Sequence, residues 1–161
     1  MNEEERWLLA AIGRGDLDGV RRWVTRADGL DLSAEVESVA DDTDWRVVEL
    51  ATEEADGKEG FLEACADAFA LPDWFGMNWD ALEECLRDLD LTGVSGVLVV
   101  WTGWEELAEG APETVATAVD VLRSAVRSWV DDGSPGAVLL AGPAEEDEPA
   151  VIRGLPPLSA D

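Results

Sequence analysis

Three short apolar runs constrain the fold of this chain more than any other feature. They are residues 46–51 (RVVELA), 96–101 (GVLVVW) and 137–142 (AVLLAG). Each run is almost continuously apolar, which is typical of parallel strands that are buried on both faces. Helical patterns separate the runs, so we expect an α/β fold in which a small three-stranded parallel sheet is covered by helices.

The segments between these runs have the periodicity of amphipathic helices. The first helix is expected from about Glu59 to Ala70, and the proline that follows ends it. A second is expected from about Asn78 to Leu89, and a long third from Pro112 to about Val130, with proline in its first turn. Residues 103–110 are expected to add a short helical turn. The element order is therefore β–α–α–β–α–β.

The chain divides into three parts by composition. Residues 1–44 are expected to form a helical extension, 45–142 the main domain, and 143–161 an acidic tail that contains prolines. The extension has the pattern of a helical hairpin. The first helix of the hairpin is carried by Trp7, Leu8, Ala11 and Ile12, and the second by Leu17, Val20, Trp23 and Val24.

The tail lacks a hydrophobic period. It is expected either to be extended or to lie on the main domain through Val151, Ile152 and Leu155.

The charge of the chain restricts its possible functions. The chain of 161 residues contains 37 acidic and 11 basic residues, which gives a net charge of −26. Such a field repels nucleic acids and anionic membranes and attracts basic partners. Histidine and tyrosine are absent, so serine–histidine and cysteine–histidine catalysis within the chain is excluded.

Cysteine content and the N-terminus bear on the cellular compartment. Cys65 and Cys85 fall on apolar helix faces, which favours buried thiols in a reducing compartment. The acidic N-terminus has no signal-peptide pattern, and the longest apolar run is too short to span a membrane. We therefore expect a cytoplasmic protein.

The second helix of the main domain carries an acidic stripe. Asp80, Glu84 and Asp88 are spaced i, i+4, i+8 and therefore share one face, opposite the apolar face. Like charges at this spacing oppose helix formation by a few tenths of a kcal/mol per pair. The stripe is either an ordinary acidic surface or a binding face for cations, and the loop before it favours the second interpretation.

That loop, DWFGMNWD, is rich in aromatic residues. Trp74, Phe75 and Trp79 lie within six positions, which is more than two short helices need for packing. Gly76 is expected to supply a positive φ or an open backbone amide, and Asn78 a helix cap. Tryptophan beside carboxylates makes a surface that meets arginine by ion pairing and by cation–π contact.

The residues LPDWFGMNWDAL, followed by x-x-Cys-Leu, resemble the signature of the barstar family of ribonuclease inhibitors. The resemblance extends more loosely from residue 46 to residue 142. It implies a three-stranded parallel sheet with helices, no catalysis, and one-to-one inhibition of a microbial ribonuclease. In that family the loop and the following helix enter the nuclease active site, where carboxylates replace RNA phosphates. The family's complex with barnase is an established example of electrostatic steering and of a charged hot spot.

The resemblance assigns roles to individual positions. Trp74 stands where an aromatic residue covers the catalytic centre of the nuclease, and Gly76 and Asn78 stand where the loop backbone is shaped. Asp80 matches an aspartate that pairs with a nuclease arginine, and Glu84 takes the place of the central aspartate.

Other positions depart from the family pattern or complete the expected site. Glu83 stands where an aromatic residue is common, and Ser124 where some members have a glutamate, with Asp120 as a possible substitute one turn earlier. Trp79 and Asp88 complete the expected partner-binding set. The partner implied is a basic microbial ribonuclease or nuclease toxin domain, and the protein is expected to be an immunity-type inhibitor that is monomeric when free.

Two other classes of function remain open. The acidic surface fits a binding module or nucleic-acid mimic directed at another basic protein. A carboxylate enzyme with Mg²⁺ at Asp80, Glu84 and Asp88 is disfavoured, because no phosphate-binding glycine loop accompanies them. We expect no catalytic residues, no metal and no cofactor.

Overall fold

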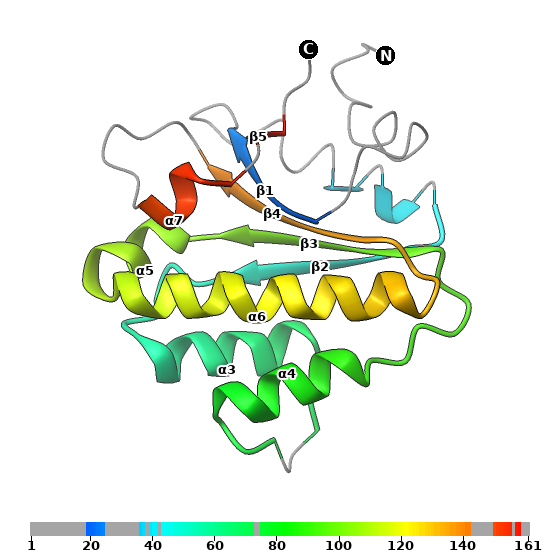
Figure 1. Cartoon of the computed structure of the whole chain (residues 1–161), viewed down its shortest axis with the longest axis horizontal. Coiled ribbons are helices and arrows are strands. Elements are labelled where there is room, and N and C mark those ends of the chain that lie inside the picture. Colours follow the sequence, from blue (N-terminus) through cyan, green and yellow to red (C-terminus); the bar gives the residue numbers. More distant parts are fainter. Residues whose placement is uncertain are drawn as a thin grey trace.

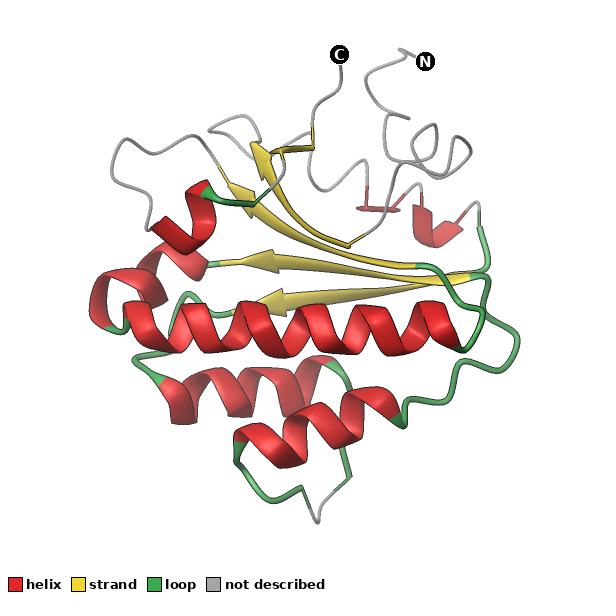
Figure 2. Cartoon of the chain, viewed as in Figure 1, coloured by secondary structure: helices red, strands yellow, loops and turns green. Residues whose placement is uncertain are grey.

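The computed structural model describes residues 19–24, 36–37, 39–41, 43–72, 75–142, 150–155 and 157–158. The strands are β1 (Gly19–Val24), β2 (Trp45–Ala51), β3 (Gly96–Thr102), β4 (Gly136–Gly142) and β5 (Pro157–Leu158). The helices are α3 (Lys58–Ala68), α4 (Trp79–Arg87), α5 (Trp104–Gly110), α6 (Pro112–Asp131) and α7 (Ala150–Arg153). Helices α3, α4 and α6 lie on one side of the sheet (Figure 1; Figure 2).

The strands form one sheet in the order β2-β3-β4-β1-β5, and every neighbouring pair is parallel. The expected strands correspond to β2, β3 and β4, so the prediction of a parallel α/β fold is confirmed. Six of the seven residues of β3 and all seven of β4 are buried, as their apolar composition requires. The predicted number of strands is wrong, because β1 and β5 extend the sheet beyond β4.

Strand β1 corrects the prediction for the N-terminal part. Residues 19–24 were expected in the second helix of a hairpin, but they pair with β4 in register from Gly19 opposite Ala137. Val20 is buried among the residues under the helices, and Trp23 is buried in the cluster on the other face of the sheet. Two apolar residues three positions apart fit one face of a helix, but they also fit opposite faces of a strand. The first expected helix lies outside the described residues.

The predicted helices of the main domain are confirmed within about two residues at each end. Helix α3 ends where Ala70 takes a positive φ of 52° and the Leu71 N–H donates to the Ala66 carbonyl at 2.9 Å. This arrangement satisfies carbonyl groups at the end of the helix. Helix α6 begins at Pro112, as its sequence indicates.

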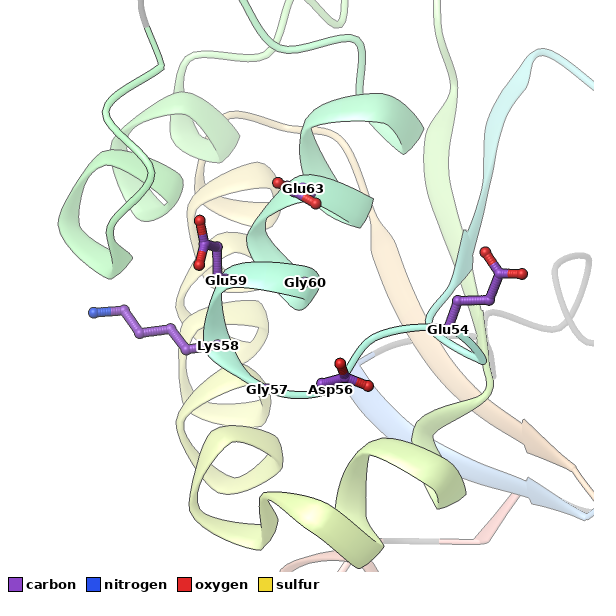
Figure 3. A pocket seen from close by; sticks show the side chains of 7 residues that line it. All are labelled: Glu54, Asp56, Gly57, Lys58, Glu59, Gly60 and Glu63. Carbon is purple, nitrogen blue, oxygen red and sulfur yellow. The ribbon is translucent and has the colours of Figure 1, made fainter.

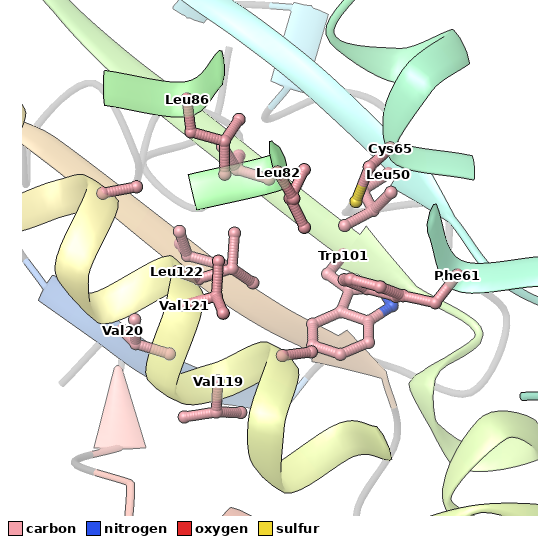
Figure 4. Packing of buried hydrophobic residues seen from close by; sticks show 14 of the residues in the cluster. Val20, Leu50, Phe61, Cys65, Leu82, Leu86, Trp101, Val119, Val121 and Leu122 are labelled. Atoms are coloured by element: carbon pink, nitrogen blue, oxygen red, sulfur yellow. The ribbon is translucent and has the colours of Figure 1, made fainter. Parts of the chain in front are cut away.

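The main core lies between the sheet and helices α3, α4 and α6 (Figure 4). Three of its largest side chains are the fully buried tryptophans Trp101, Trp104 and Trp129. The indole N–H of Trp129 donates to the Leu86 carbonyl at 2.8 Å and so ties α6 to α4. The other two indoles donate to Thr52 Oγ1 and the Ala141 carbonyl at 2.8 and 3.2 Å, so none of the three leaves a buried donor unpaired.

The opposite face of the sheet buries a second, smaller cluster. Val36 and Val39, from the segment before β2, cover this face together with Trp23. Because β3 and β4 have apolar residues on both faces, this cover is required to keep their second face from water. The remaining buried members are Leu98, Val100, Ala137, Leu139 and Ala141.

A buried arginine joins β1 to the end of β4. The Arg22 side chain is 4% exposed, and its Nη1 donates to the carbonyls of Trp23, Leu140 and Gly142 at 2.8–3.0 Å. Its guanidinium also lies 4.7 Å from the ring centroid of Trp104. The bonds satisfy a charge that is costly to bury, and they make β1 an integral part of the sheet.

The described part of the C-terminal tail lies on the main domain. Ile152 in α7 and Leu155 after it are buried in the main core, and Val151 packs beside them. Two arrangements were expected for the tail, extended or packed on the main domain, and its described part is packed on the main domain. No helix in the described ranges is long and apolar enough to cross a membrane.

Candidate partner-binding site

The loop before α4 is fixed by Asn78, as the sequence predicted. Its Oδ1 accepts a hydrogen bond from the Ala81 N–H at 2.8 Å, which caps the helix, and its Nδ2 donates to the Gly76 carbonyl at 3.2 Å. Of the two roles expected for Gly76, the positive φ is not found there: the left-handed residue is Met77, with φ 52°. Trp74 lies outside the described residues.

The described aromatic residues of this loop serve the core. Phe75 is buried in the main cluster. Trp79 is half-buried, and its ring centroid lies 5.6 Å from that of Phe61. The packing against Phe61 holds the first turn of α4 against α3, so only part of the Trp79 side chain is exposed to solvent.

The acidic stripe is exposed along its whole length. Asp80, Glu84 and Asp88 all face solvent, while Leu82 and Leu86 on the opposite side of α4 are buried. The helix ends at Arg87, and Asp88 is its C-cap residue, whose backbone N–H donates to the Glu84 carbonyl at 3.1 Å. The prediction that these carboxylates share one face of a helix is confirmed for Asp80 and Glu84, whereas Asp88 lies one position beyond the end of the helix.

The negative charges of the stripe affect the pKa of the neighbouring Cys85 thiol. Burial and the negative charges of Glu84 and Asp88 raise the pKa of Cys85. A raised pKa keeps Cys85 in its neutral form, and its side chain is buried as the sequence predicted. The thiol is therefore a packing residue under the stripe and adds no charge to it.

Glu83 has a different environment from the stripe. It is half-buried, and its Oε1 accepts a hydrogen bond from Ser124 Oγ on α6 at 2.7 Å. The two positions that depart from the family pattern are thus partners of each other. Asp120, the possible substitute on α6, is exposed and lies 3.9 Å from Arg123 Nη1 in an i, i+3 ion pair. Sequence reasoning named these residues but gave no signal for their pairing.

A polar pocket of about 520 Å³ opens at the start of α3 (Figure 3). It contains four acids and one lysine, but Lys58 and Glu54 point in opposite directions (Figure 3). Within the described residues, no group of three or more acids or cysteines is arranged to hold a metal ion. The lining residues are Glu54, Asp56, Gly57, Lys58, Glu59, Gly60 and Glu63.

Residues 45–141 match the family model described as Barstar (barnase inhibitor). The chain belongs to the barstar family. The resemblance read from the loop and helix sequence is confirmed, and the barstar family is one of protein inhibitors, not enzymes. No curated protein matches the chain significantly.

Solved structures with a similar fold come from another group of proteins. Cdc6p from Pyrobaculum aerophilum has a TM-score of 0.60 at 19% identity, over 95% of this chain and 40% of its own. ORC2 from Aeropyrum pernix, in ADPNP–ADP complexes, has a TM-score of 0.59 at 15% identity, over 94% and 44%. This chain spans less than half of either protein, and the identity is low enough that the likeness shows the fold alone. The sequence has no GxxxxGK[ST] phosphate-binding motif.

Proposed function

We propose that this barstar-family chain is a stoichiometric inhibitor of a basic microbial ribonuclease or nuclease toxin domain. It blocks the active site with the loop at residues 74–78 and with α4. The observation that carries the proposal is the exposed stripe of Asp80, Glu84 and Asp88 on a helix whose start is fixed by Asn78.

The proposed mechanism is mimicry of the RNA backbone. Consecutive carboxylates of the stripe lie one helical turn apart, about 6 Å between Cβ atoms. Their repulsion costs helix stability in the free protein, and cations in the phosphate-binding site of a ribonuclease relieve it. The net charge of −26 steers a basic partner toward the chain and raises the association rate at low salt.

We further propose that the protein has a protective role. An inhibitor that acts by occupying an active site needs no catalytic group, and the chain has no histidine to supply one. We assign the inhibitory module to residues 45–142 and the role to immunity in the cytoplasm, where the inhibitor meets a ribonuclease before it harms the cell.

Titration of a ribonuclease tests the proposal. Increasing amounts of the protein are added to a fixed concentration of barnase-type ribonuclease, and cleavage of a fluorogenic RNA is followed. Activity is expected to fall linearly and to vanish at a one-to-one ratio. Equal binding to barnase and to cytochrome c, a basic protein that is not a nuclease, would instead support the acidic binding module.

A further inference from the structure

Exposed large apolar side chains are rare in the described part of the chain. They are Met77, which is 36% exposed, and Val130, which is 51% exposed. Val130 lies near the end of α6, whereas Met77 lies in the loop directly before α4. Met77 is therefore an apolar side chain placed next to an otherwise acidic face.

The backbone at Met77 is strained. A φ of 52° places it in the left-handed region, which costs a residue with a Cβ about 1–2 kcal/mol. Its neighbour Gly76 would adopt this conformation without that cost. The other described non-glycine residue of this kind, Ala70, ends α3, where a left-handed residue is ordinary. Met77 has no such role, because α4 has not yet begun.

The hydrogen bonds of Asn78 hold Met77 in this conformation. One bond reaches back to the Gly76 carbonyl and the other accepts from Ala81, so the backbone is bound on both sides of Met77. Its partly exposed side chain belongs to a residue three positions before Asp80. A partner that binds Asp80 therefore meets Met77 at the edge of the same contact.

We propose that Met77 is a specificity-determining residue of the partner-binding face. The inference rests on the proposed function, since its partner is the ribonuclease bound by α4. Met77 selects ribonucleases with an apolar or aromatic side chain at the rim of the cationic site, and disfavours those with a charged side chain there, which the contact would desolvate. The carboxylates attract any basic site, whereas this contact discriminates among them.

Three variants of full-length protein test this proposal, by equilibrium unfolding and by dissociation rate from a ribonuclease that the parent inhibits. Met77→Gly removes the strain and the side chain, so it is expected to unfold at higher urea concentration yet dissociate at least about tenfold faster. Met77→Asn keeps a residue that tolerates the left-handed region and is expected to weaken binding similarly. Met77→Leu keeps an apolar side chain and is expected to stay within about threefold of the parent.

Val130→Ala is the matched control, because it shortens the other exposed apolar side chain without touching this loop. It is expected to leave binding unchanged. If Met77→Gly and Met77→Asn bind the ribonuclease as tightly as the parent, Met77 does not determine specificity, and the proposed function still stands. If the parent inhibits no microbial ribonuclease, the proposed function itself fails and the role of Met77 fails with it.

Discussion

Replacing Glu84 by glutamine is expected to change folding stability and partner binding in opposite directions. Glu84 is exposed at the middle of the stripe, with Asp80 one turn before it and Asp88 one turn after. In the described ranges, no cation lies within ion-pair distance of it. Each like-charge pair at this spacing costs about 0.2–0.5 kcal/mol of helix stability. Glu84→Gln removes two repulsive pairs, and it is therefore expected to stabilise the free protein by up to about 1 kcal/mol.

Binding is expected to change in the opposite direction. A carboxylate buried against nuclease arginines leaves them unpaired when it is neutralised, which costs about 2–5 kcal/mol. That range corresponds to a loss of affinity of roughly 30-fold to several thousand-fold. The inhibition constant for a barnase-type ribonuclease and the dissociation rate measure this loss, and urea unfolding measures stability.

Glu109→Gln is the matched control, because Glu109 is also exposed but lies on α5. It removes the same charge and is expected to slow association slightly at low salt only. If Glu84→Gln inhibits as tightly as the parent, or if both variants weaken binding equally, the acidic stripe is not the binding face. In the second case the attraction is spread over the whole surface.

Three further predictions concern packing and pH. Trp23→Ala is expected to destabilise the fold by about 3–5 kcal/mol, since Trp23 is buried on β1, whereas the exposed Val130→Ala changes stability by less than about 0.5 kcal/mol in urea unfolding. Burial raises the pKa of Cys65, so the unfolded chain releases this proton at lower pH than the folded protein does, and stability falls by up to about 1.4 kcal/mol per pH unit above about pH 8.5. The pKa of Cys85 is also raised, so denaturation curves of Cys65→Ala at about pH 8–10 should show a shallower slope than those of the parent, and an unchanged slope would contradict the prediction. Ser124→Ala removes the donor to Glu83 and is expected to cost about 1–2 kcal/mol, and an unchanged unfolding midpoint would show that this bond adds nothing.

Much of the fold was encoded locally and could be predicted from the sequence. Strands β2, β3 and β4 have nearly continuous apolar runs, and buried parallel strands require that pattern whatever surrounds them. Helix α4 has a cap at Asn78 and separate apolar and acidic faces, so its position and the common face of its carboxylates followed from spacing alone. The family signature lies in this same local stretch.

Only the tertiary structure decided the features that depend on distant partners. The spacing of Val20 and Trp23 fits either a helix or a strand. The segment forms a strand because it pairs with β4, which is more than a hundred residues away in the sequence. Glu83 finds Ser124 across 41 residues because α4 and α6 pack together. The positive φ falls on Met77 because the side chain of Asn78 binds the Gly76 carbonyl, a bond that neighbouring residue types do not specify. Periodicity describes which face of an element is apolar, and pairing between elements determines what that face meets.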